Sequence, residues 1–522
     1  MIGGGHNGLT AAAYLARAGK RVVVLERRHV LGGAAVTEEV FPGFRFSVCS
    51  YVCSLLRPQV IRDLDLPSHG FEVIPQESTF MPLPDGRYLF RHGSEEDTYQ
   101  EISKFSPRDA EAYPRFGRLM GRLAKFIAPT LTMTPPDVGS LNPAELRKLL
   151  ALNKQVKTLS EDELYTFARL MTMSAADYLD EWFETDALKA GMCSSGIIGT
   201  LLGPRSPGTA YVLMHHYMGE IDGAYRAWGY VRGGMGMVSE SIARAARSFG
   251  AETRVNAEVR RILVQDGWAI GVELANGERI RSRVVASGAD PKRTFLTFLD
   301  RSELPADFVR GIENFKIEGS SGKVNFALKE APSFEALPGN GPHLQGAISI
   351  GPSVDYIEKA YDEAKYGDFS RRPFIDMCVP TTLDPTLAPP GQHVLSCFVQ
   401  YAPYHLRSGT WEEKREAFGE TVTDTIEEYV PNLRDIILHR QVLSPWDLEQ
   451  VIGLTGGNIF HGELTPDQLF FLRPTAGWAQ YRTPIRGLYL CGSGAHPGGG
   501  VMGAPGLNAA REILRDMAYR RV

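Results

Sequence analysis

The sequence of 522 residues contains no long apolar run, no block of basic residues and no paired cysteine motif. No stretch reaches the roughly 18 to 20 consecutive apolar residues that a membrane-spanning helix needs, so we expect no transmembrane segment, although contact with a membrane surface is compatible with the sequence. The formal charge is -5 and Lys and Arg are dispersed, which provides no electrostatic footprint for nucleic acid. We therefore expect a small-molecule function and no nucleic-acid partner; the oligomeric state is not indicated.

Cysteine is scarce, with six residues in the chain, and no pair has C-x-x-C or metal-ligand spacing. This excludes a redox dithiol of the usual kind and indicates no metal site, and it suits a reducing compartment. Cys49 and Cys53 are the nearest pair. We interpret them as packed thiols, because free cysteine is among the most buried residue types; a redox dithiol is the alternative.

Little sequence precedes the first motif, MIGGGHNGLTAAAYL. Only Met1 and Ile2 stand before Gly3, which leaves no room for a targeting peptide and less than the about five or six residues of a typical strand. Because a glycine loop of this kind follows the central strand of its sheet, we expect that the first strand is truncated. The natural product would then carry about five or more further apolar residues upstream.

The glycines of this motif fit the G-x-G-x-x-G pattern of dinucleotide-binding loops. Gly3 permits the tight turn, Gly5 lets the backbone approach a pyrophosphate, and Gly8 lets the helix pack on the sheet. Glu26 ends the following strand, VVVLE, where a carboxylate accepts hydrogen bonds from ribose hydroxyls and repels the 2'-phosphate of NADP. Together these residues predict a bound dinucleotide.

Further motifs resemble those of the flavin-dependent amine oxidase and phytoene desaturase superfamily. They are ERRHVLGGAAVT, WGYVRGGMGMVSESIA, VVASGAD and GLYLCGSGAHPGGGVMGAPG, which occur in the family's order across the whole chain. The resemblance implies FAD, and implies that the cofactor-binding residues are Gly3, Gly5, His6, Asn7, Gly8, Glu26, Arg27, Gly32, Gly33, Ala34, Gly234, Met235, Val259, Gly288, Gly492 and Met502. At Ala34 the sequence departs from amine oxidases, which usually place an arginine after the Gly-Gly pair, so a charged contact to the phosphates is missing there.

The resemblance also implies a fold and a location. We expect an α/β protein with a Rossmann-like FAD-binding domain of the glutathione-reductase type, built from 1-70, 215-300 and 475-522. A discontinuous α+β substrate domain, 71-214 and 301-474, would combine a helical insertion with a mixed sheet. The match narrows to a phytoene-desaturase-like branch, which implies a mitochondrial protein if the source is eukaryotic and a cytoplasmic one if it is bacterial.

The activity that the resemblance implies is FAD-dependent oxidation of an apolar substrate at a C-H or C-N bond, with oxygen or a quinone as acceptor. A redox-neutral isomerase or hydratase that uses FAD, and a flavoprotein that mainly regulates a respiratory complex, are the alternatives. A disulfide reductase is disfavoured because the chain lacks a dithiol and a second nucleotide motif.

Two side chains are candidate catalytic residues. GSSGKVNFAL resembles the stretch in which amine oxidases place a lysine near flavin N5, and Lys323 is the matching residue; the alternative is a lysine on an edge strand in solvent. His496, in the C-terminal glycine-rich loop, either contacts the flavin or acts as acid or base, or else stabilises the loop. Of the adjacent His215 and His216, at most one is expected to enter a pocket.

Aromatic residues are frequent in the middle of the chain. They either pack in the core or line an apolar substrate tunnel, and they are Tyr211, Tyr217, Tyr225, Trp228 and Tyr230.

Overall fold

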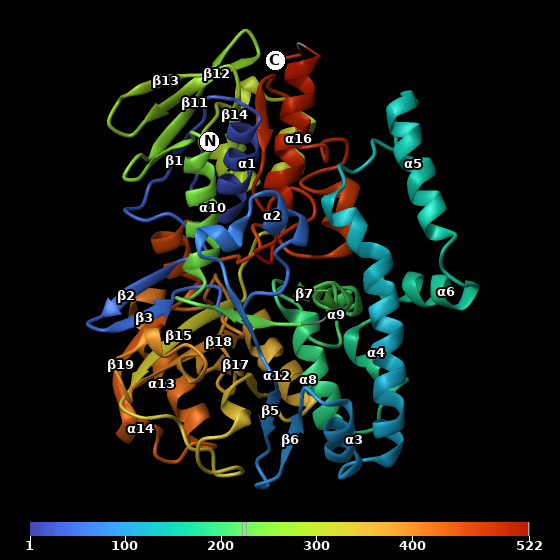
Figure 1. Cartoon of the computed structure of the whole chain (residues 1–522), viewed down its shortest axis with the longest axis vertical. Coiled ribbons are helices and arrows are strands. Elements are labelled where there is room, and N and C mark those ends of the chain that lie inside the picture. Colours follow the sequence, from blue (N-terminus) through green and yellow to red (C-terminus); the bar gives the residue numbers. More distant parts are fainter. Residues whose placement is uncertain (222, 226, 520) are drawn as a thin grey trace.

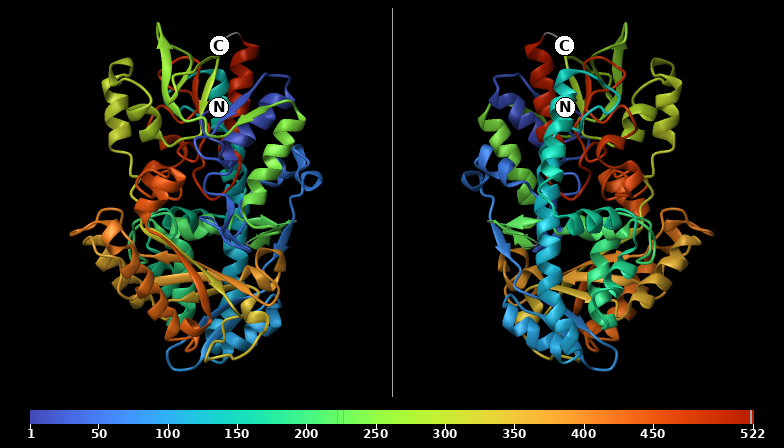
Figure 2. Two further views of the ribbon diagram at one scale, coloured as in Figure 1. Left: turned by 90° about the vertical axis from the view of Figure 1, so that its left-hand side faces the viewer. Right: turned by 90° about the vertical axis from the view of Figure 1, so that its right-hand side faces the viewer.

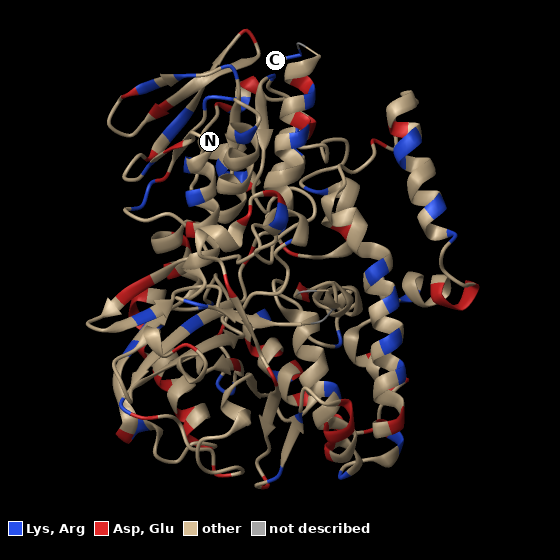
Figure 3. Cartoon of the chain, in the orientation of Figure 1, with Lys and Arg blue, Asp and Glu red and all other residues tan. Residues whose placement is uncertain are grey.

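The structure is a computed structural model that describes residues 1–221, 223–225, 227–519 and 521–522. Figure 1 shows two stacked parts: the upper part holds both chain ends and several short strands, and the lower part holds a broad sheet flanked by helices. The side chain of Tyr225 lies outside the described part. In Figure 3 acidic and basic residues occur in both parts.

The upper part is built on a parallel sheet of short strands. Its strands are β10 (Glu252–Arg254), β1 (Val23–Leu25), β14 (Val285–Ser287) and β20 (Leu488–Leu490). The pairs β10–β1 and β14–β20 are parallel, and Ile2 makes parallel bridges to both β1 and β14. The order β10, β1, Ile2, β14, β20 is the Rossmann-like arrangement that the glycine motif predicts.

Ile2 occupies the central position of this sheet. Its N–H donates to the Ala286 carbonyl and its carbonyl accepts from Gly288 N–H, both at 2.8 Å, while Gly3 N–H donates to the Leu25 carbonyl at 2.8 Å. The side chain is 4% exposed. The short segment before Gly3 therefore joins the two halves of the sheet.

Three helices cover the parallel sheet: α1 (His6–Arg17), α10 (Gly236–Ser248) and α16 (Ala504–Ala518). Helix α1 packs between the other two, and its fully buried alanines at 11, 12 and 13 permit the close approach. Beside the sheet lies an antiparallel one of β11 (Val259–Gln265), β12 (Trp268–Leu274) and β13 (Arg279–Arg281). Its turns fall at the DG and NG pairs, as expected.

The lower part contains a seven-stranded mixed sheet in the order β19, β15, β18, β17, β16, β5, β6. The strands are β19 (Ile437–Leu443), β15 (Ser321–Leu328), β18 (His393–Gln400), β17 (Phe374–Cys378), β16 (Ala347–Ile350), β5 (Thr79–Pro82) and β6 (Tyr88–Arg91). Strand β15 is buried along its whole length between β18 and β19. Helices α12 (Val354–Lys365) and α13 (Trp411–Glu427) belong to this part.

The predicted helical insertion is present. It comprises α3 (Glu95–Ser103), α4 (Pro107–Ile127), α5 (Pro143–Val156), α6 (Glu161–Leu170), α7 (Ala175–Asp180), α8 (Asp186–Ile197) and α9 (Thr209–His216). The long helix α4 starts at a Ser106 cap whose hydroxyl accepts from the Asp109 amide. Figure 2 shows α4 running along one side of both parts. Within the described residues, no helix has the length and apolarity needed to cross a membrane.

The remaining helices and strands are short. They are β2 (Thr37–Phe41), β3 (Phe44–Ser47), β4 (Val73–Pro75), β7 (Glu220–Ile221), β8 (Ala224–Tyr225), β9 (Gly229–Val231), α2 (Pro58–Asp63), α11 (Ala306–Glu313), α14 (Leu433–Ile436) and α15 (Pro445–Asp447). The antiparallel pair β4–β9 lies where the chain passes between the sheets.

Candidate cofactor and active site

The glycine loop brings two backbone segments close together at the start of α1. A Cβ atom on Gly8 would lie 2.4 Å from the Gly3 carbonyl oxygen, and one on Gly33 would lie 3.2 Å from the Gly5 Cα. Gly5 caps the helix, so the first-turn amides have no partners within the helix. Free amides and the positive end of the helix dipole make this corner a site for an anion.

Glu26 is fixed at the end of β1 by two backbone amides. The Gly4 N–H donates to its Oε2 atom at 2.7 Å and the Arg28 N–H donates to its Oε1 atom at 2.9 Å. The side chain is 6% exposed. A buried carboxylate with both oxygens held in this way is a rigid acceptor beside the glycine loop.

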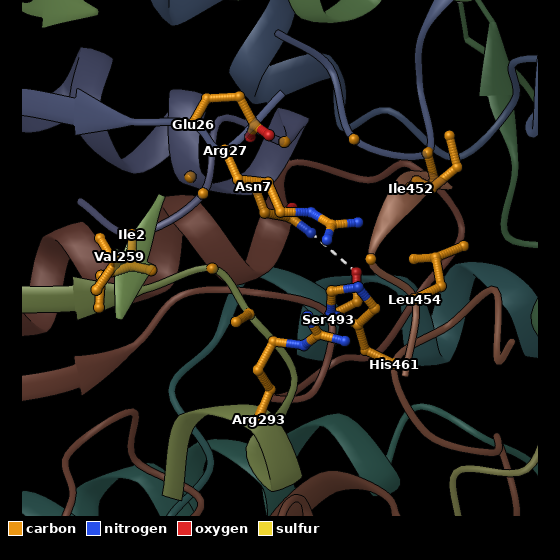
Figure 4. A pocket seen from close by; sticks show the side chains of 18 of the residues that line it. Ile2, Asn7, Glu26, Arg27, Val259, Arg293, Ile452, Leu454, His461 and Ser493 are labelled. Atoms are coloured by element: carbon orange, nitrogen blue, oxygen red, sulfur yellow. Dashed lines mark hydrogen bonds between the residues drawn. The ribbon is translucent and has the colours of Figure 1, made fainter. Parts of the chain in front are cut away.

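A cavity, which we call the glycine-loop cavity, runs along these groups and is shown in Figure 4. Eleven of the predicted cofactor-binding residues line it: Gly3, Gly5, His6, Asn7, Gly8, Glu26, Arg27, Gly33, Ala34, Val259 and Gly288. Its other walls include residues that are not among the predicted cofactor-binding residues, namely Glu258, Arg293, Ile452, Leu454, His461 and Ser493.

Several polar atoms in this cavity are buried without a hydrogen-bond partner among the described residues. They are both ring nitrogens of His6, Oδ1 of Asn7 and Nδ1 of His461, whereas Asn7 Nδ2 donates to Ser493 Oγ at 2.9 Å (Figure 4). Burial, together with a smaller effect of the neighbouring His461, lowers the pKa of His6 to about 4. Unpartnered buried polar atoms call for a ligand, so the cavity fits a molecule with several hydrogen-bonding groups.

Two guanidinium groups, those of Arg27 and Arg293, line the same cavity as the carboxylates of Glu26 and Glu258. Burial lowers the pKa of Arg27, and the charge of Arg293 lowers it further. Arg27 Nη2 donates to the Gln450 carbonyl at 2.9 Å, and Arg293 Nη2 lies 3.5 Å from a carboxylate oxygen of Glu449. These arginines supply positive charge in a cavity where Ala34 has none.

A second cavity, the inner cavity, continues from the first. It shares His6, Ala34, Ile459 and Ser493 with the glycine-loop cavity, and it extends to Lys323 on β15. The joined cavities therefore lead from the dinucleotide motif in the upper part to the mixed sheet in the lower part.

Lys323 is 2% exposed and faces the inner cavity. Its Nζ atom donates to Ser396 Oγ at 2.6 Å and lies 4.6 Å from the centre of the Tyr51 ring. Burial lowers the pKa of Lys323. The alternative of an edge-strand lysine in solvent is wrong, because β15 is an internal strand.

An acidic group lies two strands away on the same face. Lys323 pairs with Phe398 across β15–β18, and Phe398 pairs with Asp376 across β18–β17. Tyr51 covers this row, and its hydroxyl donates to Asp376 Oδ2 at 2.5 Å. The Ser349 hydroxyl donates to Oδ1 at 3.2 Å, and burial raises the pKa of Asp376. The Tyr51 side chain thus lies between the Lys323 amine, which lines the inner cavity, and the titratable carboxyl group of Asp376.

The predicted pair of adjacent histidines separates as expected. His216 lines the inner cavity and stacks on Trp228 with 6.1 Å between ring centres. His215 is fully buried and lines neither the glycine-loop cavity nor the inner cavity.

Five predicted cofactor-binding residues, Gly32, Gly234, Met235, Gly492 and Met502, do not line the cavities but make contacts elsewhere in the structure. Gly32 N–H donates to the Gly4 carbonyl at 2.9 Å, and Met235 N–H donates to Ser47 Oγ at 3.0 Å in the turn that includes Gly234. Gly492 packs on Gly288, and the Met502 carbonyl accepts from Arg57 N–H at 3.0 Å. None of these five is among the residues that line the glycine-loop cavity or the inner cavity.

His496 also lies away from these cavities. Its Nε2 atom is 2.8 Å from the Thr130 carbonyl, and Tyr481 donates its hydroxyl proton to the His496 carbonyl at 2.8 Å. Burial lowers its pKa to about 4. This position supports the alternative in which His496 stabilises the C-terminal loop.

The cysteines are free thiols, as predicted, and all six are buried. Burial raises the pKa of Cys49 and of Cys53 to about 12. Thiols with raised pKa values are poor nucleophiles at neutral pH, so neither is poised for thiol redox chemistry.

The chain belongs to the family of flavin containing amine oxidoreductases, whose sequence profile matches residues 8–514. It is 43% identical to rat (Rattus norvegicus) pyridine nucleotide-disulfide oxidoreductase domain-containing protein 2, over 99% of this chain and 93% of the relative. It is 30% identical to a subunit of limonene dehydrogenase from Castellaniella defragrans, over 99% and 94% respectively. These matches confirm the resemblance that the motifs indicated.

Two further similarities bear on chemistry and fold. Chloroplastic prolycopene isomerase of Daucus carota is 26% identical over all of this chain and 80% of the relative. The solved structure of cyclohexylamine oxidase from Brevibacterium oxydans superposes with a TM-score of 0.58 at 18% identity, covering 99% of this chain and 98% of that one. The latter confirms the fold class, an α/β fold with a Rossmann-like domain and a mixed sheet.

Proposed function

We propose that this protein is an FAD-dependent oxidoreductase that oxidises a small, largely apolar molecule at a C-H or C-N bond and passes the electrons to oxygen or a quinone. The observation that carries the proposal is the continuity of the two cavities from Glu26 and the glycine loop to Lys323. A dinucleotide in the first cavity would direct its other end into the second.

The residues of the glycine-loop cavity fit FAD. Glu26 would accept hydrogen bonds from the ribose, and the α1 amides with Arg27 and Arg293 would hold the pyrophosphate. The unpartnered nitrogens of His6 and oxygen of Asn7 would meet the polar groups that follow. The flavin ring, when bound, supplies a hydride acceptor.

The inner cavity would hold the substrate and exclude water. Much of its wall is apolar, including Leu55, Ile198, Phe398 and Phe460. Lys323 would place a cation beside the reacting centre, where a positive charge stabilises developing negative charge. Tyr51 and Asp376 offer a route for a proton away from that centre.

The test is to purify the protein, release and identify its cofactor, and follow the flavin absorbance near 450 nm under anaerobic conditions. Amines, polyenes and acyl chains would be added in turn. We expect released FAD and bleaching by one of these classes. A protein that holds no FAD would contradict the proposal at its first step.

One second candidate has support from a relative. The similarity to a prolycopene isomerase favours a reaction in which FAD is retained and the substrate undergoes no net oxidation. Isomerisation would be identified if the substrate is converted without consumption of an acceptor and the bleached form of the flavin does not accumulate.

A further inference from the structure

A third cavity, the outer cavity, adjoins the inner cavity on the side away from the glycine loop. The two share the lining residues Tyr51, Val52, Ile198, His216 and Trp228, which we call the neck. The outer cavity reaches the surface at Glu77 and Gly93, both exposed. It lies among β5, α4 and α8, in the lower half of Figure 1.

The chemistry of the wall changes at the neck. Beyond it the outer cavity is lined mainly by hydrogen-bonding side chains: Gln76, Ser78, Thr79, Ser194, Ser195 and Ser349. The inner cavity has aliphatic and aromatic side chains over much of its wall. A molecule that spans the neck therefore meets apolar surface at one end and polar surface at the other.

Two buried polar atoms of residues that line the outer cavity, Gln76 Nε2 and Thr79 Oγ1, have no hydrogen-bond partner among the described residues. Burial of a hydroxyl group without a partner is unfavourable, and a ligand group that exchanges a hydrogen bond with it removes that penalty. The position of Thr79 on β5 places this contact on the outer side of the neck.

The charges around the outer cavity do not favour an ionic ligand. Arg91 and Glu77 contribute one charge of each sign. Asp376 accepts hydrogen bonds from Tyr51 and Ser349, and burial raises its pKa. The other titratable groups whose charges affect the pKa of Asp376 or of Tyr51 are Lys323, Tyr230 and Cys378. His92 and His216 also line the outer cavity. A formal charge on the ligand would lose hydration without a dedicated counter-ion.

We propose that the substrate is an amphiphile with an uncharged hydrogen-bonding head group, whose apolar end passes the neck into the inner cavity while its head group stays in the outer cavity. The apolar end is then the part that is oxidised beside Lys323. Calling this molecule the substrate rests on the proposed function, whereas its binding across the neck does not.

The experiment is isothermal titration calorimetry of the flavin-loaded protein with a series of simple amphiphiles at pH 7. From 1-butanol to 1-octanol, each added CH₂ group should tighten binding about fourfold, which corresponds to about 0.8 kcal/mol per buried CH₂. Octanoate and octylammonium, which carry the same chain with a charged head, should bind at least tenfold more weakly than 1-octanol.

Two variants narrow the neck from different elements: Ile198→Trp and Val52→Phe. Each should weaken 1-octanol binding at least tenfold, and the exposed Leu150→Trp on α5 is the matched control that should leave it unchanged. Melting temperature and flavin content identify which variants are folded. Unchanged octanol affinity in a folded neck variant, or equal binding of the charged amphiphiles, would overturn the proposal.

The outcomes separate this inference from the proposed function. In one outcome 1-octanol binds tightly, the neck variants abolish this binding, and no compound bleaches the flavin. This result would support the amphiphile site and count against the proposed oxidoreductase activity. In the other outcome a compound bleaches the flavin, and its affinity and rate are unchanged in the neck variants. This result would support the oxidoreductase activity and overturn the amphiphile site.

Discussion

Replacing Glu26 with alanine should weaken FAD binding and also destabilise the empty protein. The carboxylate accepts from the Gly4 amide at 2.7 Å and from the Arg28 amide at 2.9 Å while 6% exposed. A hydrogen bond to a charged group contributes about 1.5 to 3 kcal/mol. Losing both acceptors should therefore lower the free energy of unfolding by about 3 kcal/mol or more, even before the cofactor is considered.

The effect on the cofactor adds to this loss. If the ribose donates to the same carboxylate, one lost charge-assisted bond corresponds to an increase in the FAD dissociation constant of at least about tenfold. Fluorescence quenching during titration of the apoprotein with FAD measures the dissociation constant, and urea unfolding of the apoprotein measures the stability term separately.

Glu38→Ala is the matched control. Glu38 also pairs with Arg28, at 2.8 Å, but its side chain is 20% exposed and lies on β2. Partly exposed ion pairs contribute little to stability, so FAD affinity should stay within about twofold of wild type. An FAD dissociation constant that is unchanged in folded Glu26→Ala protein would refute the assignment of the ribose to Glu26.

Three other predictions follow from buried groups. Lys323→Met should slow reoxidation of reduced flavin by oxygen more than it slows reduction, and equal rates of reoxidation in stopped-flow traces would count against a cation beside the flavin. Changing Cys49 and Cys53 to serine should leave flavin reduction intact, and loss of reduction in folded protein would restore the thiol mechanism. Burial lowers the His496 pKa from its usual 6.5 to about 4; the folded state therefore resists protonation, and stability falls as pH drops from 6.5 to 4. Urea unfolding at pH 7 and 4 should show wild type losing about 3 kcal/mol more than His496→Gln, and parallel losses would contradict this.

Local motifs predicted the part of the site that lies within one βαβ-like unit. The glycine loop, Glu26 and the second glycine pair are close in sequence, and their conformations follow from backbone geometry, so their meeting in one cavity was foreseeable. Lys323 was found by resemblance, but only the sheet order shows that β15 is internal and that the amine is buried.

The distant walls of the site were not predictable in this way. Arg293 and His461 reach the glycine-loop cavity from segments that are far apart in the chain, and neither carries a motif with a fixed partner. The sequence position of Arg293 could have indicated its role, because it follows β14 and ligands bind at the carboxyl ends of parallel strands. Gly234 and Met235 were predicted from a motif, and their turn contacts the β2–β3 hairpin through Thr37 and Ser47.

We expect FAD to extend through both joined cavities and to end beside Lys323. A crystal structure of the yellow, flavin-loaded protein tests it most directly. We predict electron density for the adenosine at Glu26 and for the flavin ring in the inner cavity, with N5 and Lys323 Nζ bridged by a single water. A ring placed outside the inner cavity, or a glycine-loop cavity that excludes the adenosine, would contradict the account.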